Sequence, residues 1–207
     1  MPVITDITPQ VKRKGYYNIF IDGKYSLALS EADLASFQLR KEQIIDSNLL
    51  DNLKQAHISS KCYNCSLRYL AVRPRSINEV REYLTFRKGY SDEEVDSAIG
   101  KLKAQKYLDD EDFAQLWIKN RLDLAPRPIS VIKMELLKKG VDKDIIDESL
   151  KQIDSDMELI SVCELAGKRY RQVRYQDKQK LTEFLARRGY KYSLIQQAFE
   201  QLALFEN

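Results

Sequence analysis

A helix–glycine–helix segment occurs three times in this sequence, with about 50 residues between copies. Its glycines are Gly89, Gly140 and Gly189, and two cationic residues precede each of them. Cations complement the negative end of a helix dipole, and glycine takes the left-handed conformation that ends a helix without steric cost. Each copy therefore predicts a helix that stops at the glycine and a second helix after it. A period of this size indicates a repeat architecture.

Apolar residues recur at the same distances after each glycine. Their spacings of four and three residues follow one face of a helix, so we expect them to form the core of each repeat. They are Tyr90, Val95, Ile99 and Leu102 in the first copy, Val141, Ile146, Leu150 and Ile153 in the second, and Tyr190, Ile195, Phe199 and Leu202 in the third.

A further helix is expected ahead of each copy. Arg73-Pro-Arg-Ser76 ends the first of these helices, because proline disfavours helical geometry in the residue before it, and Ser76 with Glu79 forms a capping box for the next. Ala125–Ile129 is the break in the second repeat, with Pro128 in the first turn of the helix that follows. The predicted helices are 61–72, 76–88 and 91–105, then 109–124, 129–139 and 142–153, and the third repeat begins near residue 156.

The first 30 residues are the β-like part of the chain. Residues 16–21 and 24–29 flank Asp22-Gly23, a dipeptide that favours a type I′ hairpin turn. A two-residue loop pairs Phe20 with Tyr25 and Ile19 with Ser26. Residues 3–7 would add a third strand, since an isolated hairpin is marginal in water, and Ser30 would cap a helix over 31–37. This part is either a structural cap on the helices or a hairpin that docks on a partner.

A separate helix over residues 46–60 completes the N-terminal part. The chain thus divides into an N-terminal extension and three repeats of three helices each. The predicted boundaries are 1–58, 59–106, 107–154 and 155–207.

Cysteine and histidine offer little chemistry here. Cys62 and Cys65 are two residues apart with His57 nearby, but zinc normally needs four ligands and only Cys163 remains. A redox pair would follow a strand in a βαβ unit, and no such strand precedes these residues. Structural thiols are the simpler interpretation, with a redox- or metal-responsive role as the alternative. We predict no metal site and no cofactor.

A catalytic set is also missing from the sequence. The single histidine has no cysteine or serine nucleophile beside it, and no glycine-rich phosphate loop follows a strand. The acidic run Asp109–Asp112 points around a helix and is typical of a helix N-terminus. We therefore expect a protein that is not an enzyme. No apolar run approaches the ~20 residues of a membrane span, no signal-peptide core begins the chain, and three cysteines suggest no disulfide framework, so a cytoplasmic protein is expected.

Positive charge concentrates near the C-terminus. Residues 161–191 hold nine Lys and Arg against three Asp and Glu, a net charge of +6 in a chain whose total is +3. Tyr170, Tyr175, Tyr190 and Tyr192 are interleaved with them. Cations that neutralise phosphates beside aromatic rings that stack on bases are typical of nucleic-acid surfaces. A solvated helix face is the plainer alternative. The expected contact residues are Arg169, Arg171, Arg174, Arg187, Arg188 and Lys168, followed by Arg73, Arg75 and Arg121.

Several of these segments resemble RecX proteins, the bacterial regulators of the RecA recombinase. Leu67–Val80 resembles the start of the family's first repeat, and Lys106–Ala114 its junction into the second. Ile132–Val141 resembles the middle signature, and Phe184–Tyr190 the C-terminal one. Together these segments cover roughly residues 60–203 in the family's order.

The chain departs from the family pattern in two places. Leu84 lies five residues before its glycine, whereas Leu136 and Leu185 lie four before theirs, so the first repeat has an extra residue at its helix end. Arg127-Pro128 stands where the family often has a glycine.

The resemblance implies a mainly α protein with three tandem three-helix repeats in an elongated curved array, preceded by a small β-hairpin extension. It further implies a monomer that lies in the groove of a RecA–DNA filament, meets single-stranded and duplex DNA through the filament, and modulates ATP hydrolysis, filament growth and strand exchange. Inhibition is the commoner family outcome, although the residues do not decide its sign. The alternative is a sequence-specific transcription regulator, because paired helices around a glycine turn resemble helix-turn-helix units.

Overall fold

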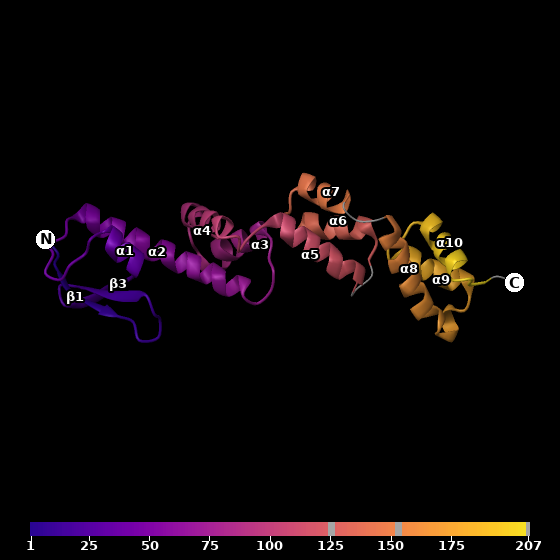
Figure 1. The fold of residues 1–207 in the computed structure, drawn as a ribbon, viewed down its shortest axis with the longest axis horizontal. Helices are drawn as coiled ribbons and strands as arrows, with labels where there is room; N and C mark the ends of the chain where they lie inside the picture. The colour runs from indigo at the N-terminus through magenta and orange to yellow at the C-terminus, as the bar shows by residue number, and fades with distance from the viewer. Residues whose placement is uncertain (124–126, 152–154, 206–207) are drawn as a thin grey trace. The chain divides into compact units, whose positions relative to one another are not determined.

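The computed structural model describes residues 1–123, 127–151 and 155–205. These residues form a mainly helical protein with a three-stranded antiparallel sheet at its N-terminus, as predicted (Figure 1). They divide into two compact units. Unit 1 comprises Met1–Arg73 and Val80–Tyr107, and unit 2 comprises Pro74–Glu79 and the chain from Leu108 onward. No helix of the described residues is long and apolar enough to cross a membrane.

The sheet of unit 1 has the order β1 (Ile4–Pro9), β2 (Tyr16–Ile21) and β3 (Lys24–Ser30). Asp22 and Gly23 have φ values of 49° and 76°, which confirms the predicted type I′ turn. Phe20 pairs with Tyr25 as predicted, but Ile19 pairs with Leu27 and not with Ser26. The prediction failed because a bulge shifts the register between Ile19 and Phe20.

Two helices follow the sheet. The first, α1 (Glu31–Ser36), begins at the predicted cap Ser30, which forms a capping box with Asp33. The second, α2 (Ser47–Leu70), is one helix of 24 residues, so the two helices predicted on either side of residue 60 are wrong. Residues 57–61 contain no proline or glycine that would end it. One helix also has buried residues along its whole length, from Leu53 in the sheet's core to Cys62 and Cys65 further on.

The first repeat continues with α3 (Ile77–Glu82), a π-helical turn (Tyr83–Arg87) and α4 (Asp92–Ala104). The predicted capping box at Ser76 is present, since its Oγ accepts from the Glu79 N–H at 3.1 Å. The extra residue of this repeat is accommodated in the π turn, a single wide turn of the kind that absorbs insertions. Leu84 consequently remains fully buried.

The second repeat consists of α5 (Asp110–Asp123), α6 (Ile129–Lys138) and α7 (Lys143–Lys151). The structure does not describe residues 124–126, which include part of the break predicted over 125–129. Ile153, at the end of the last predicted helix, also lies outside the described residues. Pro128 is the N-cap of α6, so its predicted place in the first turn is one residue off. The third repeat consists of α8 (Ser155–Tyr170), a 3-10 turn (Val173–Tyr175), α9 (Lys178–Arg187) and α10 (Tyr192–Gln201).

The predicted apolar positions that the structure describes are buried or partly buried. Val95, Ile146 and Ile195 are completely buried, whereas Leu150 and Leu202 are partly buried. The sheet with α2, the second repeat and the third repeat each have a hydrophobic cluster of their own. Separate small cores are what a chain of repeats requires, because each repeat buries its own apolar face.

Unit 2 contains two inter-helix contacts of the same construction. At the start of α3, the Ile77 N–H donates to Asp110 of α5 at 2.8 Å, and at the start of α6 the Ile129 N–H donates to Glu158 of α8 at 2.9 Å. An acidic residue of one repeat therefore caps a helix of the repeat before it. We call these two contacts the repeat junctions.

Candidate nucleic-acid interface

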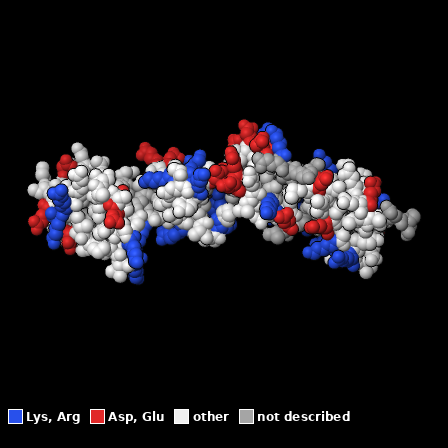
Figure 2. All heavy atoms as spheres, viewed as in Figure 1, with Lys and Arg blue, Asp and Glu red and all other residues white. Residues whose placement is uncertain are grey.

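The C-terminal cations are placed by the end of α8, the 3-10 turn and α9. Figure 2 shows Lys and Arg side chains gathered beside the C-terminal end of α8. The structure separates the predicted residues into groups that the sequence had placed together. Arg169, Arg174 and Arg188 meet around two aromatic rings, whereas Lys168 and Arg171 line a separate groove beside α8.

The first group is an arginine–aromatic cluster of Arg169, Arg174, Arg188, Tyr175 and Phe184. The guanidinium carbons of Arg169 and Arg188 lie 4.9 and 5.0 Å from the centre of the Phe184 ring. Arg174 lies 5.8 Å from the centre of Tyr175, whose ring is 5.1 Å from Phe184. Such contacts contribute about 0.5–1 kcal/mol each at exposed sites, and they hold the guanidinium groups in place.

No carboxylate of the described residues forms an ion pair with any arginine of this cluster. Three positive charges therefore share one surface without a counter-charge in contact. Guanidinium groups bind phosphate or carboxylate oxygens with two parallel hydrogen bonds. The cluster can consequently bind an anionic chain, such as the backbone of a nucleic acid.

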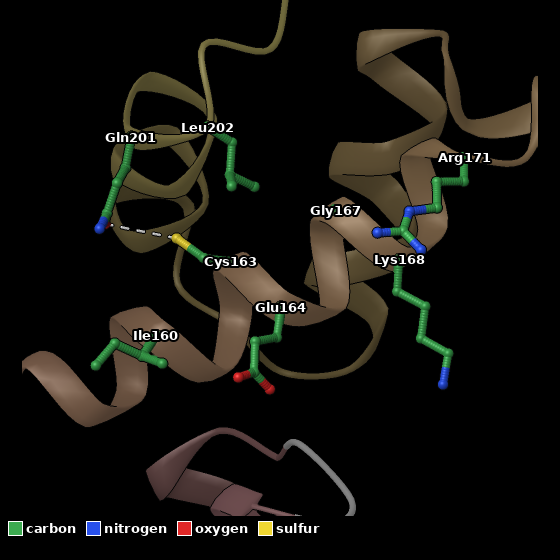
Figure 3. A pocket seen from close by; sticks show the side chains of 8 residues that line it. All are labelled: Ile160, Cys163, Glu164, Gly167, Lys168, Arg171, Gln201 and Leu202. Carbon is green, nitrogen blue, oxygen red and sulfur yellow. Dashed lines mark hydrogen bonds between the residues drawn. The ribbon is translucent and has the colours of Figure 1, made fainter.

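The second group lines a groove of about 540 Å³ between α8 and α10 (Figure 3). Its rim carries Lys168, Arg171 and Glu164, and its floor includes Cys163, whose Sγ lies 3.6 Å from Gln201 Oε1. The carboxylate on the rim lowers the net charge of the groove. This groove is thus less favourable for a polyanion than the arginine–aromatic cluster.

The remaining predicted contacts differ in availability. Arg187 is exposed at the end of α9 and donates to the Glu183 carbonyl at 3.3 Å. Arg121 is paired with Glu135 at 2.7 Å, and its guanidinium carbon lies 4.5 Å from the Trp117 ring centre. Arg73 and Arg75 are half-buried before α3, and each interacts with other parts of the protein. Arg187 is therefore the most accessible of these four.

The predicted stacking aromatics are mostly used internally. Tyr190 is 4% exposed and lies 3.4 Å from Ser161, so it belongs to the core and not to a binding surface. Burial accordingly raises the pKa of its hydroxyl. Tyr170 packs edge-on against Phe205. Of the four predicted tyrosines, Tyr192 is the one exposed for most of its surface, at 67%.

Phe184 was not predicted as part of a site. It is four residues before Arg188 on α9, a spacing that brings two side chains together on one helix face. That spacing could have indicated from the sequence that Phe184 and Arg188 are in contact. The contribution of Arg169 and Arg174 from other elements had no signal in the local sequence.

The cysteines and acidic residues have structural surroundings. Cys62 is fully buried, and burial raises the pKa of its thiol to about 12, so it remains protonated at neutral pH. Cys65 Sγ lies 3.8 Å from the Tyr83 hydroxyl. Asp109 accepts from the Glu111 N–H at 2.8 Å, as a helix N-cap does. Among the described residues, no group of three or more His, Cys, Asp or Glu side chains is arranged to hold a metal ion.

The fold and this surface define the class of protein: tandem three-helix repeats behind an N-terminal sheet, with a basic cluster in the last repeat that pairs with no described carboxylate. Family models match along almost the whole chain. They are the regulatory protein RecX N-terminal domain over residues 2–46, and the first, second and third RecX three-helix domains over 62–102, 109–150 and 158–199. The chain belongs to the RecX family.

Individual relatives agree with this assignment. Regulatory protein RecX of Lactobacillus johnsonii is 37% identical over 99% of this chain and 76% of its own length. That of Clostridium botulinum is 29% identical over 100% of this chain and 99% of its own. A crystal structure of regulatory protein RecX matches with a TM-score of 0.78 and 27% identity, over 97% of this chain and all of that one. RecX from Lactobacillus salivarius has a TM-score of 0.61 and 25% identity, over 72% of this chain and 98% of its own.

Proposed function

We propose that this protein regulates RecA recombinase by binding in the groove of the RecA–DNA filament. It acts in the cytoplasm as a monomer, without catalysis, and inhibits ATP hydrolysis, filament growth and strand exchange during recombination, DNA repair and the SOS response. Membership of the RecX family supports the partner. The structural observation that carries the proposed filament contact is the arginine–aromatic cluster, in which Arg169, Arg174 and Arg188 pair with no carboxylate of the described residues.

The cluster suits a filament for an electrostatic reason. A filament groove presents protein surface and DNA phosphates together, and cations that displace condensed counterions gain affinity at low salt. The four-part division at 58/59, 106/107 and 154/155 completes the proposal, with each repeat contacting its own stretch of the groove.

The direct test is DNA-dependent ATP hydrolysis by the cognate RecA on single-stranded DNA. We expect the protein to lower the rate at concentrations well below that of RecA, because a molecule that blocks filament growth acts on many subunits. An unchanged rate, together with preferential binding to one duplex sequence, would favour the helix-turn-helix transcription regulator instead.

Charge reversal then locates the contact. We expect the triple variant R169E/R174E/R188E to lose filament binding by tenfold or more, since three phosphate contacts become repulsive. K168E/R171E/R187E changes the same charge on other faces of the same repeat and should have a smaller effect. The control K119E/K138E/K143E makes an equal change in net charge in the second repeat and should also have a smaller effect than R169E/R174E/R188E. Equal effects of all three variants would contradict the cluster as the contact.

A further inference from the structure

A second cationic feature lies in unit 1, far along the chain from the arginine–aromatic cluster. The loop Gln10–Gly15 between β1 and β2 contains Lys12, Arg13 and Lys14 in succession and no acidic residue. Figure 2 shows cationic side chains at the end of the sheet where Figure 1 has this loop. Within the described part of the chain, no carboxylate forms an ion pair with any of the three. We call this segment the basic loop.

The basic loop is held in place at its base. The Gln10 N–H donates to the Tyr16 carbonyl at 2.8 Å, and the Glu31 N–H of α1 donates to the Gly15 carbonyl at 2.9 Å. The guanidinium carbon of Arg13 lies 3.6 Å from the centre of the Tyr16 ring. These contacts reduce the entropy that the loop would lose on binding a ligand.

A groove of about 590 Å³ lies beside the basic loop, and Tyr16 connects the two. The Tyr16 ring contacts Arg13, and its hydroxyl lies 3.0 Å from Ser60 Oγ on the groove wall. The rest is lined by hydroxyl, amide and ammonium groups of α1, α2 and α4 together with Ala32, Phe37 and Ala56. Among the polar side chains, those with no hydrogen bond or ion pair to another described residue are Ser36, Asn52, Gln55, Ser59 and Lys101.

The groove has one carboxylate, Asp33, and one of its oxygens is occupied by local hydrogen bonds. Asp33 Oδ2 accepts from the Ser30 hydroxyl at 2.6 Å as part of the α1 capping box. The groove therefore presents neutral groups that can donate hydrogen bonds next to three cations that pair with no described carboxylate. Lys and Arg with Ser, Asn, Gln and Tyr side chains are the groups through which proteins contact the phosphates and sugars of nucleic acids.

We propose that unit 1 binds a nucleic-acid backbone, with phosphates at the basic loop and the adjoining sugar-phosphate chain in the groove. A protein partner would be expected to use aromatic or apolar anchors at the centre of its interface. Here the groove adjoins three consecutive cations that pair with no described carboxylate, a pattern that favours a polyanion. A lipid surface would require several apolar side chains to insert, whereas the loop exposes only Val11. This inference concerns direct binding of DNA and does not require RecA. The basic loop and the arginine–aromatic cluster belong to different units, so each can be tested without the other.

The test is binding to a fluorescent single-stranded oligothymidylate, measured by anisotropy over a range of salt concentrations without RecA. The variant K12S/R13S/K14S should bind at least tenfold more weakly at low salt. Its plot of log affinity against log salt should be shallower by about 2, since each lost phosphate contact on a single strand contributes about 0.7. The control K24S/R87S/K103S removes the same residue types from exposed positions of unit 1 outside the loop and the groove.

A second variant separates the groove from the loop. N52A/Q55A replaces two exposed, neutral residues of α2 by a better helix former, so the fold is retained. We expect weaker binding with an unchanged salt slope, because no charge is lost.

Three outcomes would overturn the proposal. One is equal binding by K12S/R13S/K14S and its control, and another is no binding of DNA by the wild type at 50 mM salt. The third is loop-dependent binding to vesicles of anionic lipid in preference to DNA. An effect on RecA ATP hydrolysis that persists in K12S/R13S/K14S would leave the proposed function intact, so the two hypotheses fail separately.

Discussion

The glycine turns of the two units have the same backbone but different surroundings. Gly89 in unit 1 and Gly140 in unit 2 both have a φ of 73°. A Cβ on Gly89 would meet no atom of the described residues within 4 Å, whereas a Cβ on Gly140 would lie 2.5 Å from Asn78 Cβ. Gly189 also faces its neighbouring repeat, with Val131 at 3.0 Å. One sequence signature therefore has two roles, a local helix stop in unit 1 and a packing contact at the repeat junctions in unit 2.

The helix stop itself is the same in all three repeats. The residue after the glycine donates its N–H to the carbonyl of a fully buried leucine, at 3.2 Å for Tyr90 to Leu84 and for Val141 to Leu136, and at 3.3 Å for Tyr190 to Leu185. In the first repeat this bond spans one residue more, because the π turn precedes it. The local structure thus tolerates an insertion, while the junction contact depends on the neighbouring repeat.

The largest expected effect separates these two roles. Gly89→Ala should cost about 1–2 kcal/mol, the penalty for a left-handed non-glycine residue. Gly140→Ala adds crowding against Asn78 and should cost about 2–5 kcal/mol in total. Trp117, the only tryptophan, lies in unit 2, so its fluorescence during urea unfolding reports that unit. Gly140→Ala should lower the midpoint of this transition, and Gly89→Ala should leave it unchanged.

A double-mutant cycle with Asn78→Gly isolates the crowding at Gly140. The Gly140→Ala cost should fall in the Asn78→Gly background, because the clashing Cβ is absent. An equal Gly140→Ala cost in the wild-type and Asn78→Gly backgrounds would show that the junction contact is unimportant.

A smaller effect is expected at the second repeat junction, where the Ile129 N–H donates to Glu158. Pro128, the N-cap of α6, provides no side-chain hydrogen bond, so Glu158 supplies the cap by accepting from Ile129. Glu158→Ala should destabilise unit 2 by about 1 kcal/mol, the usual loss for a helix cap. Glu158→Gln retains an acceptor oxygen and should recover most of it. The measurement is again the Trp117 transition, and a Gln variant as unstable as the Ala variant would argue against the capping role.

The smallest expected effect is a pH dependence confined to unit 1. His57 Nδ1 lies 2.7 Å from the Ala28 carbonyl, and burial, its main influence, lowers the pKa of His57 below its ordinary 6.5. The unfolded chain then takes up a proton more readily, so stability is complete above about pH 7 and declines as pH falls through 6.5. Hydrogen exchange of α2 and β3 should accelerate between pH 7.5 and 5.5, after correction for intrinsic exchange rates, and His57→Gln should remove this acceleration. The same dependence in unit 2 would point to another group.

The candidate site was only partly predictable. Charge counting over residues 161–191 located the right segment, because net charge is a property of composition. Charge counting did not separate Arg169 from Lys168, because it contains no information on direction. Adjacent helix residues point about 100° apart, and packing decides which of them meets the aromatic rings. Arg121 was expected to be available, but Glu135, 14 residues away in sequence, pairs with it. The basic loop was readable as three consecutive cations, yet its groove comes from α1, α2 and α4 together.

The sequence by itself determined the repeat, the glycine stops, the type I′ turn and the apolar core positions. These features depend on residues a few positions apart, so helical period, capping and turn preferences are sufficient to predict them. Tertiary structure alone decided the bulge beside Ile19, the continuity of α2 and the contacts of Gly140 and Glu158 with a neighbouring repeat. Those outcomes depend on which surface each residue meets after folding, and local pattern contains no information about partners so distant in the chain.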